Sequence, residues 1–117
     1  MRTMILYRPV GTEELKLIEK SGNKRFPPRL PDQPIFYPVL NEEYAIEIAS
    51  KWNAVYNSDH KGYVTRFEVE DSFVSKYETH VVGKSTHEEL WVPSEELEEF
   101  NDHIVGEIEV TRVFDGL

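Results

Sequence analysis

The chain has no cysteine among its 117 residues. Without thiols it cannot form a disulfide framework, a thiolate zinc site or a cysteine nucleophile. The sequence also lacks a long apolar run, because the opening stretch MRTMILYRPVGTEEL reaches charged residues after only a few apolar positions. Such a stretch is too short for a signal-peptide core or a membrane span, so we expect a cytoplasmic protein.

Positive charge is scarce, and its distribution is uneven. The net charge is −9, with 13 Lys and Arg against 22 Asp and Glu. Residues 1–58 carry 8 basic and 7 acidic side chains, whereas residues 59–117 carry 5 basic and 15 acidic ones. Non-specific binding to nucleic acid or to a membrane surface requires a positive field, so the composition argues against both. Any anion-binding surface is expected in the first half.

The apolar content is sufficient for one folded domain. Hydrophobic residues make up 39% of the chain and aromatic residues 12%, and charged residues are interspersed among them. A chain of this length and composition can bury a core, and we see no repeat, linker or low-complexity stretch. We therefore expect a single domain over residues 1–117.

The first half predicts a strand, a helix, a loop and a second helix. Residues 3–10 are β-branched and aromatic, which favours a strand, and TEELKLIEKSG predicts a helix capped by Thr12. Residues 23–38 hold five prolines and predict an extended loop with a short edge strand in PIFYPV. Asn41 is expected to cap a helix over EEYAIEIASKWNAV, whose apolar face holds Tyr44, Ala45, Ile48, Ala49 and Trp52.

The second half predicts several strands and one short helix. GYVTRFEVE alternates as a half-buried strand with Tyr63, Thr65, Phe67 and Val69 on one face. Further short strands are expected around 73–77, 81–82 and 90–92, and Ser94 is expected to cap a helix over EELEEFN. The last strand, HIVGEIEVTRVF, is expected to turn Ile108, Val110 and Phe114 to one side.

This order of elements does not alternate as it does in a doubly wound fold. It predicts an α+β fold, a compact antiparallel or mixed sheet with two to three helices. Trp91, on a strand that ends at Pro93, is expected to be mostly buried against the helix that contains Tyr44 and Trp52.

Phosphate-binding loops, nucleotide-binding glycine patterns and metalloprotease motifs are all absent, so chemistry must depend on scattered residues. Arg8, on an otherwise apolar strand, either extends to the surface or points into a cleft as an anion clamp. The basic loop, which we define as Lys24, Arg25 and Arg29 around FPPRLP, either binds an anionic or heteroaromatic ligand or carries solvated charges.

Acidic and imidazole side chains offer further candidates in the second half. Glu88 and Glu89 precede Trp91 on a strand, so alternation places Glu89 on the same face as Trp91. His80 and His87 flank a loop and could meet across a hairpin, but the spacing fits two surface or turn histidines better. No metal site is predicted.

Four segments together resemble a known family. LYRPVG at the start, FYPV followed by a helix, GYVTRFEV, and the late HEELWVPSEELEEFN resemble small bacterial and phage proteins related to the ADP-ribosyltransferase fold. The resemblance implies that Arg8 holds the dinucleotide NAD, that Tyr37 or Tyr44 stacks on nicotinamide, and that Glu89 is the catalytic acid. Arg29 of the basic loop is a further candidate for NAD binding.

The resemblance implies an NAD-binding protein that cleaves the nicotinamide–ribose bond and transfers ADP-ribose to an unidentified acceptor. NAD would be a substrate here. The alternative is a non-catalytic binding or inhibitor module whose acidic C-terminal half contacts a basic protein partner.

Overall fold

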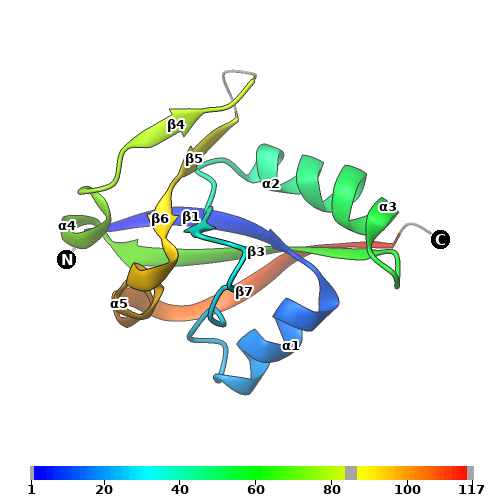
Figure 1. Ribbon diagram of the computed structural model, residues 1–117, viewed down its shortest axis with the longest axis horizontal. Helices are drawn as coiled ribbons and strands as arrows, with labels where there is room; N and C mark the ends of the chain where they lie inside the picture. Colours follow the sequence, from blue (N-terminus) through cyan, green and yellow to red (C-terminus); the bar gives the residue numbers. More distant parts are fainter. Residues whose placement is uncertain (1, 84–86, 116–117) are drawn as a thin grey trace.

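The computed structural model describes residues 2–83 and 87–115. At its centre is an antiparallel sheet in the order β1, β3, β7, formed by β1 (Thr3–Val10), β3 (Lys61–Glu70) and β7 (Ile104–Asp115). These strands run across the middle of the molecule, and helices lie on both sides of them (Figure 1). Every strand pair among the described residues is antiparallel, which confirms the α+β class and selects the antiparallel form of the sheet.

The central strand β3 is covered on both faces. It pairs with β1 along the whole of β1 and with β7 on its other side. Val64 packs against Ala45 and Ala49, whereas Phe67, three residues later, lies in the main apolar core. The strand was correctly predicted, but it is more than half-buried because its neighbours in the sheet place it between two packed layers.

The first helix, α1 (Thr12–Lys20), follows β1 directly. Its N-cap is Gly11, and no side chain caps it, so the predicted capping role of Thr12 is wrong. The Thr12 hydroxyl instead donates a hydrogen bond to Asp59, on the turn that precedes β3. Thr12 thus bonds to a side chain distant in the sequence and not to the backbone of its own helix. At the other end, Gly22, at φ 80°, ends the helix as predicted.

The second helical segment contains a wide turn. It consists of α2 (Glu42–Ile48), the π-helical turn η1 (Ala49–Asn53) and α3 (Ala54–Tyr56). Asn41 caps it as predicted, since its side-chain oxygen accepts from the Tyr44 N–H at 3.1 Å. A Cβ at Gly62 of β3 would lie 2.5 Å from the Ala49 carbonyl oxygen, so glycine is needed for η1 to pack this closely on the sheet.

The proline-rich segment is ordered and contributes to the core. Phe26 and Phe36 are buried, and β2 (Ile35–Phe36) pairs with β6 (Val92–Pro93) as the predicted short edge strand. The Asn101 side chain accepts from the Phe26 N–H at 2.9 Å and donates to the Phe26 carbonyl at 3.0 Å. A distant amide thus supplies the backbone partners that a loop lacks.

The region after β3 differs from the prediction. Residues 71–74 form the short helix α4 (Asp71–Val74), so the strand expected around 73–77 is wrong. Two short strands follow, β4 (Thr79–Val81) and β5 (Glu88–Leu90), and they pair with each other. Val74 is buried in the core, but it lies in a helical turn. A short apolar run therefore did not distinguish a strand from a helix at this position.

The late helix and the last strand also depart in detail from expectation. The helix begins as the 3-10 turn η2 (Ser94–Glu96) and continues as α5 (Leu97–Asp102), without a side-chain cap from Ser94. In β7, Ile108 is buried in the main core, but Val110 is 43% exposed and Phe114 packs on the second cluster. Two register shifts between β3 and β7 change which face each residue meets.

The main core lies on the side of the sheet that α1, α5 and the proline-rich segment cover. Its large fully buried side chains include Phe26, Phe36, Phe67 and Phe100. A smaller cluster around Ala45 and Ala49 joins the α2 segment to the other face. Within the described residues, no helix is long and apolar enough to span a membrane.

Candidate functional site

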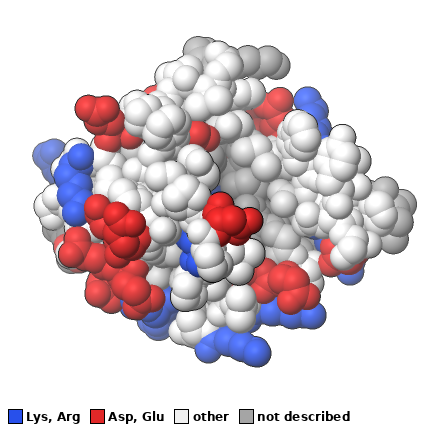
Figure 2. Space-filling view, viewed as in Figure 1, with Lys and Arg blue, Asp and Glu red and all other residues white. Residues whose placement is uncertain are grey.

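Residues from both halves of the chain surround a cavity of about 460 Å³. We call it the aromatic cleft, and its walls are Arg8, Pro9, Tyr37, Val39, Tyr44, Ile48, Asn53, Val82, Glu89 and Trp91. A hollow is visible near the centre of the face shown in Figure 2. Four side chains predicted as site residues, Arg8, Tyr37, Tyr44 and Glu89, therefore line a single cavity.

Arg8 is buried at this cleft and does not extend to the surface. Only 8% of the residue is exposed, and its guanidinium lies over the Phe36 ring at 4.7 Å from the ring centre. Glu14 of α1 accepts hydrogen bonds from Nε at 2.6 Å and from Nη2 at 3.0 Å. One edge of the guanidinium is thus fixed by an internal carboxylate, and Nη1 takes no part in that pair.

The Glu89 carboxylate is held by two hydrogen-bond donors. The Tyr44 hydroxyl donates to one carboxylate oxygen at 3.3 Å, and the Trp91 indole N–H donates to the other at 2.8 Å. Partial burial and the neighbouring negative charge of Glu89 raise the pKa of the Tyr44 hydroxyl. Tyr44 is therefore a stable donor at neutral pH, and the position of the carboxylate is fixed from two sides.

A histidine stacks on each of these two donors. His87 lies parallel to the Tyr44 ring at 4.3 Å, and His80 lies parallel to the Trp91 ring at 3.9 Å. One His87 ring nitrogen is 2.8 Å from a Glu47 carboxylate oxygen. The two histidines do lie on one hairpin, but each supports an aromatic ring of the cleft.

Among residues 2–83 and 87–115, no group of three or more histidine or carboxylate side chains is arranged to hold a metal ion.

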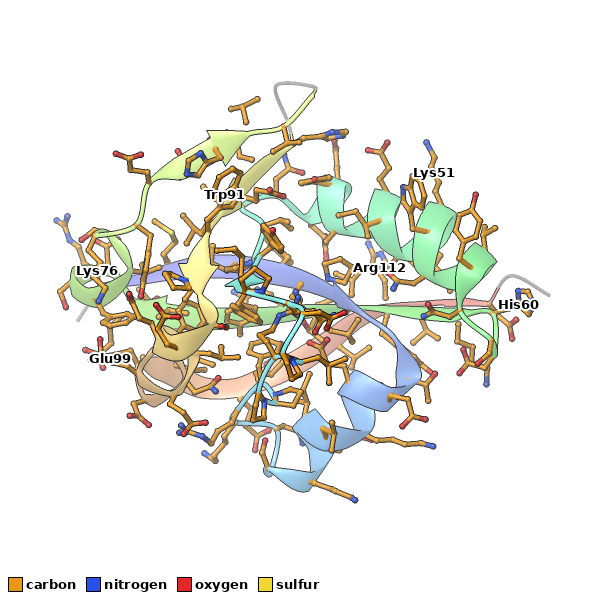
Figure 3. All side chains as sticks on the ribbon, in the orientation of Figure 1. Lys51, His60, Lys76, Trp91, Glu99 and Arg112 are labelled. Atoms are coloured by element: carbon orange, nitrogen blue, oxygen red, sulfur yellow. The ribbon has the colours of Figure 1, made fainter. Side chains whose placement is uncertain are left out.

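Trp91 departs from its prediction, since it is 42% exposed. It lies between β5 and β6, where Figure 3 labels it. Its neighbours Leu90 and Val92 are both buried, so alternation turns Trp91 to the opposite side, which is the wall of the cleft. Trp52, placed by prediction on the apolar face of the second helix, is also exposed, at 60%, and the prediction that Trp91 is mostly buried against that helix is wrong.

The two candidate tyrosines have different surroundings. One face of the Tyr44 ring is covered by His87 and its hydroxyl is bound to Glu89. Tyr37 is 39% exposed and meets Trp91 edge to face at 6.4 Å. Tyr37 and Trp91 are therefore the cleft rings with the most surface available to a ligand.

The basic loop does not act as one unit. The Arg29 guanidinium donates to the Ile35 carbonyl at 3.1 Å and lines a separate cavity of about 260 Å³ that also contacts Glu14. Burial, followed by the nearby charge of Arg8, lowers the Arg29 pKa. Arg29 thus lies outside the aromatic cleft, on the far side of the Arg8–Glu14 pair.

Arg25 is engaged elsewhere. It forms ion pairs with Asp102 at 2.9 Å and with Glu98 at 3.1 Å, and the hydrogen bond that Arg25 donates to Asp102 raises the pKa of Arg25. Lys24 is exposed. The alternative in which the loop charges serve packing and solvation fits Arg25 and Lys24 better than a shared anion site.

Several residues of the site could not be found by sequence reasoning. Glu14 lies in the first turn of α1, where a carboxylate is favourable for any helix, and nothing in its spacing indicates Arg8 as its partner. Asn53, another residue of the cleft wall, could have been noticed in the sequence. It lies on the helix face that carries Ala45 and Ala49, and an amide side chain on an apolar face requires a hydrogen-bond partner.

No family model, curated protein sequence or solved structure matches this chain significantly.

Proposed function

We propose that the aromatic cleft binds NAD and that the protein is an ADP-ribosyltransferase-like enzyme. The observation that supports this is the convergence of Arg8, Tyr37, Tyr44 and Glu89 on one cavity. The four residues lie on β1, directly after β2, on α2 and on β5, so the fold brings together side chains that are distant in the sequence. A cavity of about 460 Å³ lies in the size range of small-molecule sites.

The proposed reaction depends on Glu89. As the bond between ribose C1′ and the nicotinamide nitrogen breaks, its electron pair leaves with nicotinamide and positive charge develops on the ribose. A carboxylate fixed beside that carbon stabilises the charge, and the bonds from Tyr44 and Trp91 hold Glu89 in place before the reaction begins. An acceptor nucleophile then bonds to C1′ and loses its proton.

Arg8 would contribute to phosphate binding in a restricted way. Its Nε and Nη2 are bound to Glu14, so a ligand phosphate accepts from Nη1 while Glu14 keeps the opposite edge fixed. The pair has no net charge, so this contact orients the phosphate and adds little long-range attraction. In the same proposal, nicotinamide stacks on Tyr37 or Trp91, the two rings of the cleft with the most exposed surface.

The test is a thermal-shift titration with NAD, ADP-ribose and nicotinamide, together with an assay for nicotinamide release. A specific ligand of the folded state raises the melting temperature by mass action. We expect NAD to raise it in a concentration-dependent way and nicotinamide to be released. No shift at millimolar NAD and no release would contradict the proposal.

A second candidate function is a binding module for a basic partner. It is favoured by the exposed carboxylates of η2 and α5, which gather on the left of the view in Figure 2. Much of this charge is already paired, however, since Arg25 binds Glu98 and Asp102, and Lys76, labelled with Glu99 in Figure 3, binds Glu96 and Glu99. Salt-sensitive binding to a basic protein without any NAD response would favour this function.

A further inference from the structure

Both ring nitrogens of His87 face hydrogen-bond acceptors. Nε2 lies 2.8 Å from a Glu47 carboxylate oxygen, and Nδ1 lies 3.2 Å from the Val82 carbonyl oxygen. A neutral imidazole has one N–H, and its other nitrogen is itself an acceptor. Both contacts are therefore hydrogen bonds only when the ring carries two protons and a positive charge.

The His87 ring is also packed against an aromatic face. It lies parallel to the Tyr44 ring at 4.3 Å, and only 16% of its side chain is exposed. A cation over an aromatic ring is attracted by the negative charge on the face of that ring. The protonated imidazole thus gains from the Tyr44 ring as well as from its two hydrogen bonds.

These contacts join two walls of the aromatic cleft. Tyr44 and Glu47 belong to α2, whereas His87 directly precedes β5, the strand that carries Glu89. The Tyr44 hydroxyl donates to the Glu89 carboxylate at 3.3 Å. A change at His87 is therefore transmitted to Glu89 through one ring and one hydrogen bond.

His80 makes a similar stack without the two hydrogen bonds. It lies parallel to the Trp91 ring at 3.9 Å, and Trp91 is the second donor to Glu89. Within residues 2–83 and 87–115, the His80 ring takes part in no hydrogen bond or ion pair. No acceptor fixes its protonation state, so His80 is a matched control for His87.

The surroundings of His87 are predominantly acidic. The charged and titratable side chains on the elements that pack against it are Tyr44 and Glu47 of α2, Lys51 of η1, which pairs with Glu47 at 3.7 Å, His80 of β4, and Glu88 and Glu89 of β5. Histidine changes charge between about pH 5 and 8, whereas carboxylates, tyrosine and lysine ordinarily titrate outside this range. A transition in this range therefore belongs to one of the two histidines, and the control separates them.

We propose that His87 is a positioning residue whose protonation regulates the aromatic cleft, with the charged ring holding Tyr44 and, through Tyr44, Glu89. When the proton leaves, one ring nitrogen faces an acceptor without a hydrogen between them, and that contact becomes repulsive. Tyr44 and Glu89 are then held less firmly. The inference rests on the proposed function, in which this cleft binds NAD, and it adds that binding weakens as the pH rises through the neutral range.

The experiment measures ADP-ribose affinity by calorimetry from about pH 5 to 8, the range in which histidine titrates. His87→Phe keeps a flat ring against Tyr44 and removes the proton and both hydrogen bonds. His80→Phe is the control, because it makes the same change in the other stacked histidine. Glu47→Gln keeps the shape of its side chain and removes the charge that faces the imidazolium.

We expect the wild-type affinity to fall about five- to tenfold across this range, the effect of one lost hydrogen bond. His87→Phe should bind at every pH as weakly as the wild type does at the upper end of the range. His80→Phe should keep the wild-type pH profile. Glu47→Gln should lose affinity at a lower pH than the wild type, because the imidazolium has lost a stabilising anion. A purely structural residue would change the affinity but not the shape of the profile.

NMR of the free protein tests the same coupling without a ligand. In the wild type, the signal of the Glu89 carboxyl carbon should shift with the same midpoint as the His87 ring. This shift should disappear in Tyr44→Phe, which lacks the hydroxyl that bonds to Glu89. The measurement does not depend on what the cleft binds.

Two results would overturn the inference. A pH profile of binding that is the same in His87→Phe as in the wild type would mean that another group controls the cleft. A Glu89 signal that does not follow His87 in the free protein would mean that His87 does not position it. If the wild-type protein binds neither NAD nor ADP-ribose, the proposed function fails, and the NMR titration still decides whether His87 positions Tyr44 and Glu89.

Discussion

Aromatic side chains occupy two different environments in this protein, the main core and the aromatic cleft. In the core they contact one another, as Phe26 and Phe67 do with ring centres 4.8 Å apart. In the cleft they contact histidines and a carboxylate, as Tyr44 does with His87 and Glu89. The comparison indicates that the core rings stabilise the fold and that the cleft rings position a charged group. The predictions below test that division.

The largest expected effect concerns Phe100 in the core. It is fully buried, and three other phenylalanine rings, those of Phe36, Phe67 and Phe73, lie within 6.3 Å of it, centre to centre. Phe100→Ala should lower the free energy of unfolding by about 3–5 kcal/mol, because it removes a large apolar side chain and leaves a cavity. Urea denaturation followed by circular dichroism measures this loss. A change below about 1 kcal/mol would contradict the assignment of the main core.

The next prediction compares a buried with an exposed ion pair. Glu14→Gln leaves the nearly buried Arg8 without its charged partner and should cost about 1–3 kcal/mol of stability. Glu98→Gln removes a partner of Arg25 at the surface and should cost less than about 1 kcal/mol. Urea denaturation of both variants gives the comparison. Equal losses would mean that the cleft does not shield Arg8 from solvent.

Alkaline pH should weaken the fold through Tyr44. Its folded-state pKa is raised, mainly by burial and then by Glu89, while in the unfolded chain it titrates near the ordinary value of about 10. Above that pH the unfolded chain loses a proton that the folded protein keeps, so stability falls as pH rises. Melting temperatures from pH 8 to 11 should therefore decline less steeply in Tyr44→Phe. An identical decline in both proteins would contradict this account.

The smallest expected effect concerns Trp91, the cleft counterpart of Phe100. Because Trp91 is 42% exposed and its contacts are with His80, Tyr37 and Glu89, Trp91→Ala should cost about 1 kcal/mol or less. Binding of NAD should weaken in the same variant, since the ring is part of the cleft wall. A stability loss close to that of Phe100→Ala would erase the distinction between the two environments.

Local sequence signals predicted much of the fold. The alternation of β3, the cap at Asn41 and the end of α1 at Gly22 were all recovered, because each depends on residues adjacent in the chain. The errors arose where distant contacts decide. Thr12 bonds to Asp59 in place of capping its helix, and Val110 is exposed because register shifts in β7 change its face.

The candidate site was predicted in part. The motifs indicated Arg8, Tyr37, Tyr44 and Glu89, and all of them line the aromatic cleft. The groups that orient them could not be predicted, since Glu14, His80 and His87 meet their partners only through the packing of α1 and the β4–β5 hairpin. The misplaced burial of Trp91 has the same origin, because its exposure depends on what packs against β5 and β6.

The most direct test of the account is nicotinamide release from NAD by Glu89→Gln and by Glu88→Gln. Glutamine keeps the size of the side chain and removes the charge that would stabilise the ribosyl cation. Glu88 is the matched control, since it is adjacent in β5 but does not line the cleft. We expect Glu89→Gln to remain folded, to bind NAD and to release nicotinamide about a hundredfold more slowly or worse, while Glu88→Gln keeps wild-type activity. Equal activity in the two variants, or no release by the wild-type protein, would contradict the account.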